Sequence, residues 1–191
     1  MSGRHTGSTD VPLTAEGRRQ AEALSGPLGG YSFARVLSSP LSRARETCRL
    51  AGLGDRAETV EALREWDYGE YEGLTTPQIR EQRPDLVLWR DGCPGGETAS
   101  DVAARVDPLL EELRELAGDA VLFAHGHVLR VLTARWLGLG PEAGALFMLD
   151  TATLSMLGWE RDTPVIRLWN EDAQPAASAK RERARSSLGP S

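Results

Sequence analysis

The sequence predicts an α/β fold in which a mostly parallel sheet is covered by helices on both faces. Two short apolar runs, FARVLSS from Phe33 and AVLFA from Ala120 to Ala124, are typical of buried strands. Each run leads into a segment with helical apolar spacing. Strands that alternate with helices indicate βαβ units, which form parallel sheets between two helical layers. We therefore expect three layers, α/β/α.

The first half of the chain predicts helices around the first of these strands. Thr14 is placed as the N-cap of a helix that ends near Gly26. The strand that begins at Phe33 stops at Pro40, and LSRARETCRLAGLG after it predicts a helix ended by glycine. The irregular stretch ALREWDYGEYEGLTTPQIREQRP is rich in glycine and acidic residues. It predicts a functional loop followed by a short helix begun at Thr76.

The second half predicts a long helix, a strand, a helix and a hairpin. Apolar positions from Thr98 recur at helical spacing until Gly118 closes the helix, and Pro108 is expected to kink it. After AVLFA and HGH, VLRVLTARWLGL predicts a further helix. TLSMLGWE and PVIRLWN predict an antiparallel hairpin. We expect residues 1–172 to form one domain and residues 173–191, which are basic and lack apolar periodicity, to form a disordered tail.

Composition and charge limit the classes of partner. The chain has 191 residues and a net charge of -6, so we expect no nucleic-acid partner and no binding to an anionic membrane surface. The first residues are polar and carry no apolar leader, which predicts a cytoplasmic protein. Cys48 and Cys93 lie far apart without a metal-binding spacing, and both are expected to be reduced, structural thiols.

Residues suited to phosphate binding follow both predicted strands. Ligands of open parallel sheets bind beyond the carboxyl ends of the strands, where loops enter helix N-termini. His125 and Gly126 come directly after AVLFA, and Arg43 follows FARVLSS. A cationic side chain beside the free N–H groups of a helix start is what a phosphate group needs. A solvated arginine and a structural histidine remain the alternatives.

His127 raises the alternative of a metal site. A metal needs three or four converging ligands, and the sequence offers only three histidines and no clustered cysteine. We therefore expect no metal and no cofactor.

Four motifs, SSPLSRARET, LREWDYGEYEG, PGGET and AHGH, occur in the chain in this order. With them, the sequence resembles the histidine phosphatase superfamily, whose fold is phosphoglycerate mutase-like. The resemblance runs from GRHTGSTDVPLT to the final hairpin and leaves out only the tail. REWDYGEYEGLTT, LWRDGCPGGET and FAHGHVLR look most like the sugar-phosphate phosphatase branch, which includes sedoheptulose-bisphosphatase-type enzymes.

The resemblance implies a role for individual residues. Arg43 and His125 would clamp the transferred phosphoryl group, and Glu65 would act as the general acid. The implied substrate contacts are Thr6, Gly7, Gly126 and Glu97, of which Glu97 falls on the pocket wall. The chemistry supports these roles, because a phosphate dianion without a metal needs guanidinium and N–H donors and its leaving alkoxide needs a proton. Glu70 and Glu72 are expected to be solvated surface carboxylates.

The family's nucleophile, the histidine of an Arg-His-Gly triplet at the end of the first strand, has no match in the sequence. His5 follows MSGR, which cannot form a buried strand, and GRHTG matches a substrate loop downstream of the triplet. We therefore expect the sheet to lack its first, central strand and the chain as printed to be inactive. Either the natural protein begins further upstream, or the chain is a degenerate, non-catalytic descendant.

The predicted function is that of a metal-independent phosphomonoesterase that acts on a small phosphorylated metabolite, most simply a sugar phosphate, through a phosphohistidine. Two alternatives remain. The first is a pseudophosphatase that binds a phosphorylated ligand without hydrolysis. The second is a phosphoglycerate mutase, which transfers the phosphoryl group on the same fold.

Overall fold

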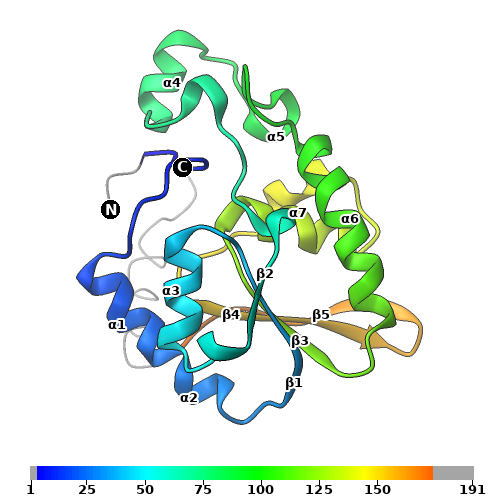
Figure 1. Ribbon diagram of the computed structural model, residues 1–191. Coiled ribbons are helices and arrows are strands. Elements are labelled where there is room, and N and C mark those ends of the chain that lie inside the picture. Colours follow the sequence, from blue (N-terminus) through cyan, green and yellow to red (C-terminus); the bar gives the residue numbers. More distant parts are fainter. Residues whose placement is uncertain (1–3, 174–191) are drawn as a thin grey trace, which may run out of the picture.

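The computed structural model describes residues 4–173 and confirms the α/β class (Figure 1). The helices are α1 (Ala15–Ala23), α2 (Ser25–Leu28), α3 (Ser42–Leu50), α4 (Thr76–Gln82), α5 (Leu88–Asp91), α6 (Ala99–Glu115) and α7 (Gly126–Trp136). The strands are β1 (Phe33–Ser38), β2 (Ala57–Thr59), β3 (Asp119–Phe123), β4 (Thr153–Glu160) and β5 (Thr163–Asp172). Except for its first residue, the tail predicted at 173–191 lies outside the described residues.

The strands form one parallel and one antiparallel sheet. In the parallel sheet the order is β2-β1-β3, so β1 is the central strand. The predicted hairpin is confirmed as a separate two-stranded sheet of β4 and β5. β2 was not predicted, because its three residues are partly or fully exposed and give no apolar run. Within residues 4–173, β3 pairs with β1 only, and β4 pairs with β5 only.

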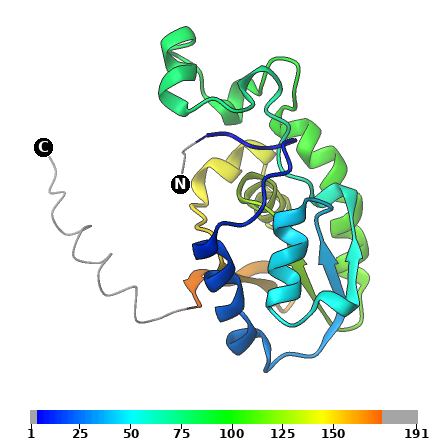
Figure 2. The ribbon, with the colours of Figure 1, turned by 60° about the vertical axis from the view of Figure 1, so that its left-hand side comes forward.

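The alternation of side chains along β1 builds two cores, one on each face of the parallel sheet. Val36 packs with residues of α2 and α3, and Leu37 packs with residues of α6 and α7. Consecutive strand residues point to opposite faces, so a strand buried on both sides needs an unbroken apolar run. In Figure 1 and Figure 2, α1 and α3 lie on one side of β1 and β3, and α6 lies on the other. The three predicted layers are confirmed.

The helix boundaries follow local capping chemistry. The Thr14 side chain accepts a hydrogen bond from Gly17 N at 3.0 Å and begins α1, as predicted. That helix ends before Gly26, which lies in the one-turn helix α2, so the first helix is shorter than predicted. Pro108 lies inside α6, which the structure describes as one continuous helix. Proline has no N–H to bond the carbonyl of Ala104, four residues earlier. Ala104 is exposed, so water can bond that carbonyl instead.

A third core fixes the long loop between β2 and α4. The loop inserts Trp66, Tyr68 and Tyr71 against residues of α6 and α7, and all three rings are at least nine-tenths buried. Large aromatic side chains bury much apolar area. The irregular stretch is therefore anchored in a core by its aromatic side chains.

The central strand predicts a large stability effect at Leu37. Its side chain is fully buried (0% exposed), so Leu37→Ala should lower the free energy of unfolding by about 2–5 kcal/mol through lost burial and a residual cavity. The matched control is Leu146→Ala, because Leu146 is 79% exposed. Urea unfolding of both variants checks this, and equal losses would contradict the packing described for β1.

Candidate active site

The carboxyl ends of β1 and β3 lie side by side and place the residues after them at one edge of the sheet. Ser38 and Phe123, the last residues of the two strands, are register partners. Ser39 N continues the ladder by donating to Phe123 O at 2.8 Å. From there the chain enters α3 after one strand and α7 after the other. Arg43, in the first turn of α3, and His125, directly before α7, therefore meet at this edge.

The Arg43 guanidinium is held by neutral acceptors. Its Nε donates to His125 Nδ1 at 3.1 Å, its Nη1 to Thr9 O at 3.1 Å and its Nη2 to Thr6 O at 3.0 Å. Within residues 4–173, Arg43 forms no ion pair with a carboxylate. Burial lowers the pKa of Arg43, and the charges of Glu65 and Asp10 oppose that shift. A half-buried arginine remains charged at neutral pH, so the edge carries a cation that no bonded carboxylate neutralises.

His125 is a neutral hydrogen-bond donor. Because its Nδ1 accepts from Arg43, its proton is assigned to Nε2, which lies 2.7 Å from Ser39 Oγ. The side chain is only 8% exposed. Burial lowers its pKa to about 4, with Arg43 acting in the same direction and Glu65 in the opposite one. At neutral pH, His125 therefore accepts from the Arg43 guanidinium on Nδ1 and carries its N–H on Nε2, which faces Ser39 Oγ.

Glu65 faces the same edge from the long loop. Its Oε1 accepts from Trp66 N at 2.9 Å and from Val128 N at 3.0 Å, and its Oε2 accepts from His127 N at 3.2 Å. The carboxylate thus lies at the start of α7, where free N–H groups favour negative charge. A Cβ atom placed on Gly126 would lie 3.9 Å from Glu65 Oε2. The structure therefore brings the predicted Arg43, His125, Glu65 and Gly126 together.

An aromatic cluster lies beside Glu65. Tyr68 Oη is 2.7 Å from His127 Nδ1, and the His127 ring centroid is 5.2 Å from that of Trp89 and 6.0 Å from that of Trp66. Arg130 packs over the Trp89 ring, with its Cζ 4.5 Å from the centroid. Burial lowers the pKa of His127 to about 3 and raises that of Tyr68. The neutral Tyr68–His127 pair therefore lies beside Glu65. From the sequence, His127 had raised only the alternative of a metal ligand.

The predicted substrate contacts Thr6 and Gly7 are engaged with the protein itself. Thr6 O accepts from Arg43, and Gly7 N donates to Glu72 Oε2 at 3.0 Å. Gly7 is buried, whereas Thr6 is partly exposed. Their backbone groups therefore hold the site together, and the part left for a substrate is the Thr6 side chain.

Glu97 supports the long loop. Its Oε1 accepts from Arg105 Nε at 2.7 Å, and its Oε2 accepts from Asp67 N at 2.9 Å. Its backbone carbonyl accepts from Trp66 Nε1 at 2.9 Å. These bonds occupy both carboxylate oxygens and tie Glu97 to the loop that carries Glu65, while its expected contact with a substrate stays a prediction.

The two acidic residues that were expected to be solvated, Glu70 and Glu72, differ in their surroundings. Glu70 is exposed, as expected, but Glu72 is partly buried and accepts from Gly7 N and from Thr9 N at 2.9 Å, so the expectation of a solvated Glu72 is wrong. His5 packs against the Tyr68 ring at 4.8 Å, and its Nε2 lies 3.3 Å from Thr76 Oγ1. The His5 ring therefore packs against the long loop and α4, and within residues 4–173 it forms no hydrogen bond with Arg43.

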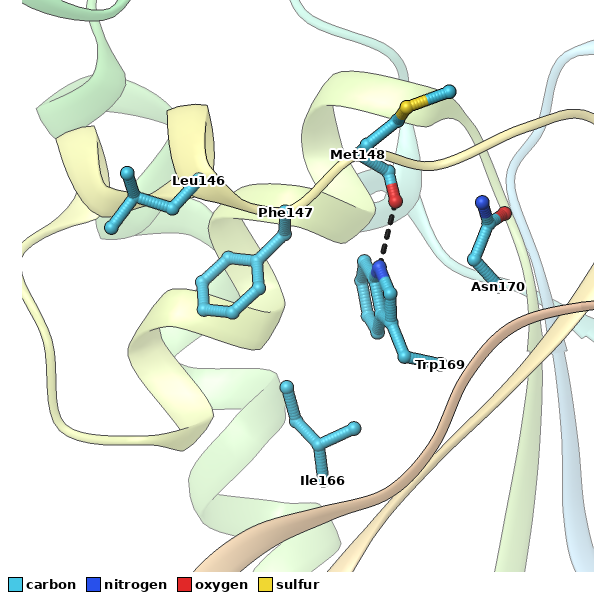
Figure 3. Close-up of a pocket in the computed structure, with 6 residues that line it drawn as sticks. All are labelled: Leu146, Phe147, Met148, Ile166, Trp169 and Asn170. Atoms are coloured by element: carbon cyan, nitrogen blue, oxygen red, sulfur yellow. Dashed lines mark hydrogen bonds between the residues drawn. The ribbon is translucent and has the colours of Figure 1, made fainter. Parts of the chain in front are cut away.

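One cavity away from this site is mainly apolar. A cavity of about 560 Å³ is lined mainly by apolar side chains from η4 (Pro141–Leu146), the residues that follow it and β5, with Trp169 Nε1 bonded to Met148 O (Figure 3). Within residues 4–173, no three histidine, cysteine or acidic side chains are grouped to hold a metal ion. No helix in that range is long and apolar enough to cross a membrane.

The two buried imidazoles predict a loss of stability in mild acid. The pKa values of His125 and His127 are about 4 and about 3 in the folded protein, against 6.5 for an unperturbed histidine. Below pH 6.5 the unfolded chain binds protons that the folded chain does not. The contribution of these histidines to the free energy of unfolding is therefore fully present above pH 6.5 and is lost as the pH falls towards 4.

His127→Gln tests this pH dependence. Each such histidine contributes a slope of up to about 1.4 kcal/mol per pH unit. Urea unfolding of His127→Gln between pH 6 and 5 should therefore show a pH slope shallower than that of the wild type by about 1 kcal/mol per unit. Identical slopes would show that His127 is protonated in the folded protein.

Comparison with known proteins identifies the family of the chain. A family model described as the histidine phosphatase superfamily (branch 1) matches residues 1–172. An acid phosphatase of Mycobacterium tuberculosis is 44% identical over 162 residues, which cover 83% of this chain and 79% of the relative. Sedoheptulose 1,7-bisphosphatase of Saccharomyces cerevisiae is 36% identical over an aligned length of 173 residues. The match covers 74% of this chain and 64% of the relative.

Solved structures agree with the fold. The structure of an open reading frame from Mycobacterium tuberculosis superposes with a TM-score of 0.84 at 38% identity, covering 90% of this chain and 91% of that one. A mycobacterial glucosyl-3-phosphoglycerate phosphatase superposes with a TM-score of 0.78 at 31% identity, covering 89% of this chain and 93% of that one. With its arginine, histidine and glutamate gathered at the sheet edge and a family match over almost all described residues, the chain belongs to the histidine phosphatase superfamily.

Proposed function

We propose that this protein is a metal-independent phosphomonoesterase of small phosphorylated metabolites, of which sugar phosphates are the best candidates. The observation that carries the proposal is the Arg43 guanidinium, which is half-buried, bonds only neutral acceptors within residues 4–173 and is held on one side by the His125 ring. Such a site is complementary to a phosphate dianion and needs no metal. Relatives named for sedoheptulose 1,7-bisphosphate and glucosyl-3-phosphoglycerate support a phosphorylated sugar as the substrate class.

Each residue of the site has a defined part in this reaction. Arg43 binds the phosphoryl oxygens through the Nη hydrogens that its carbonyl partners leave unused. The His125 Nε2–H exchanges its hydrogen bond to Ser39 Oγ for one to a phosphoryl oxygen, and both groups stabilise the charge that develops there. A histidine nitrogen attacks phosphorus as the bond to the sugar oxygen breaks, and Glu65 gives a proton to that oxygen. Water then attacks the phosphohistidine and passes a proton to Glu65, which releases inorganic phosphate and restores the histidine. The aromatic cluster of Tyr68, His127 and Trp89 lies beside Glu65, where the leaving sugar would pack.

In this proposal, none of His5, His125 and His127 is the nucleophile. Both ring nitrogens of His125 are hydrogen-bonded, to Arg43 and Ser39, and His5 and His127 pack among aromatic rings. β3 and β4 each carry one edge that no strand pairs within residues 4–173. Leu122 of β3 and Leu157 of β4 pack against the same core. An apolar strand between these edges would complete the sheet and end beside Arg43.

Two assays on two variants test the proposal. Binding of inorganic phosphate is measured by calorimetry on the 191-residue chain, and phosphate release from sugar phosphates is measured on the product that includes the in-frame codons before Met1. Arg43→Ala should abolish both. Glu65→Gln should slow turnover by about 10²–10⁴-fold because proton transfer is lost, and should weaken phosphate binding far less than Arg43→Ala.

Matched controls come from the same elements. Arg45→Ala and Glu70→Gln remove the same charges from exposed positions and should leave both assays unchanged. Arg43-dependent binding without any phosphate release would favour a pseudophosphatase, since no histidine described here is placed to attack. Binding that is indifferent to Arg43 would refute both functions.

A further inference from the structure

Residues 4–10 form a strap between the long loop and α3. At one end, His5 N donates to Leu74 O at 2.8 Å and Gly73 N donates to His5 O at 2.7 Å. At the other end, Asp10 Oδ1 accepts from Ser42 N at 2.8 Å and from Ser42 Oγ at 2.7 Å, at the start of α3. The strap therefore passes directly over the residues that the reaction needs.

One peptide group of the strap lies between two opposite charges. The Thr6–Gly7 peptide donates its N–H to Glu72 Oε2 at 3.0 Å, and its carbonyl accepts from Arg43 Nη2 at 3.0 Å. The two groups of a trans peptide point in opposite directions, so the carboxylate and the guanidinium lie on opposite sides of it. Each bond polarises the peptide in the sense that strengthens the other, because hydrogen bonds in a chain are cooperative.

Thr9 makes a second link between the same two side chains. Its N–H donates to Glu72 Oε1 at 2.9 Å, and its carbonyl accepts from Arg43 Nη1 at 3.1 Å. Each oxygen of Glu72 thus fixes one strap N–H, and each Nη of Arg43 bonds one strap carbonyl. The fork of Arg43 is set by two carbonyls whose positions depend on one carboxylate.

The strap has little freedom to find another arrangement. A Cβ atom on Gly7 would come within 2.0 Å of Trp66 O, so only glycine allows the strap to pack this closely on the long loop. Ser8 Oγ adds a hydrogen bond to Asp67 Oδ1 at 3.2 Å. The strap is therefore clamped against the loop that carries Glu65, and Glu72 is the carboxylate of that loop that accepts from two N–H groups of the strap.

We propose that Glu72 is a positioning residue that orients the Arg43 guanidinium through the backbone of the strap and so sets the affinity of the site for phosphate. This inference rests on the proposed function, in which Arg43 binds the phosphoryl group. Glu72 needs its charge for the role, since both of its oxygens must accept. Burial raises its pKa, but the hydrogen bonds from Thr9, Gly7 and Ser8 outweigh burial, and the net pKa is lowered.

The direction of the effect separates positioning from simple electrostatics. Glu72 carries negative charge close enough to Arg43 to influence its pKa. If Glu72 acted by charge alone, its removal would relieve repulsion of the anion and strengthen phosphate binding. If it positions Arg43, its removal weakens binding in spite of that relief.

Glu72→Gln tests the proposal by calorimetric titration of the 191-residue chain with inorganic phosphate. The amide keeps one acceptor oxygen but turns an NH₂ group towards a strap N–H, so phosphate affinity should fall about tenfold, the scale of one charge-assisted hydrogen bond. Glu70→Gln, the same substitution at the exposed position two residues away, should cause no loss. Glu72→Asp keeps the charge but shortens the reach, and should also weaken binding.

A double substitution distinguishes action through Arg43 from a general effect. Lysine at position 43 still attracts phosphate as a point charge but has no fork for the strap to orient. In the Arg43→Lys background, Glu72→Gln should therefore cost less than twofold in affinity. Unchanged or tighter binding by Glu72→Gln overturns the proposal, as does a full tenfold loss in the Arg43→Lys background. If the wild type itself fails to bind phosphate, the proposed function fails before the role of Glu72 is reached.

Discussion

The site depends on one constraint, which is that a half-buried arginine is held in place without a bonded carboxylate. Arg43 is fixed by two backbone carbonyls and a neutral imidazole. A carboxylate in their place would fix the guanidinium equally well but would neutralise the charge that a phosphate must meet. Neutral acceptors orient the fork and leave its charge for a ligand.

Each larger feature of the fold serves that constraint. The parallel pairing of β1 with β3 brings the starts of α3 and α7 to one edge. The burial that keeps His125 neutral also makes it an acceptor for Arg43 on one nitrogen and a donor on the other. The carboxylates near Arg43 bond backbone groups and not the guanidinium itself. Glu72 acts through the strap, and Glu65 is bonded to the backbone at the start of α7.

Local signals in the sequence were sufficient for the layers and for the positions of Arg43 and His125. Arg43 and His125 could be predicted because each follows an apolar strand, and strand ends converge whatever the details of the fold. Glu65 came from a resemblance to a known family. β2 could not be predicted, because a three-residue exposed strand has no apolar run to reveal it.

The roles of Glu72, Glu97 and Gly7 could not be predicted, for a different physical reason. Each depends on a contact with backbone far away in the sequence, such as Glu72 with Gly7 N and Glu97 with Asp67 N. The local sequence around a glutamate does not show whether its carboxylate accepts from a distant N–H or faces water. Only the fold distinguishes them, and in this chain it gives Glu70 and Glu72 opposite environments.

The most direct test of the central claim is a crystal structure of the chain with orthovanadate, a phosphate analogue. The account predicts vanadate at the carboxyl ends of β1 and β3, with its oxygens within about 3.2 Å of the Arg43 guanidinium and of His125 Nε2. Glu65 should face the same ion. Vanadate bound elsewhere, with Arg43 and His125 making no contact to it, would contradict the account.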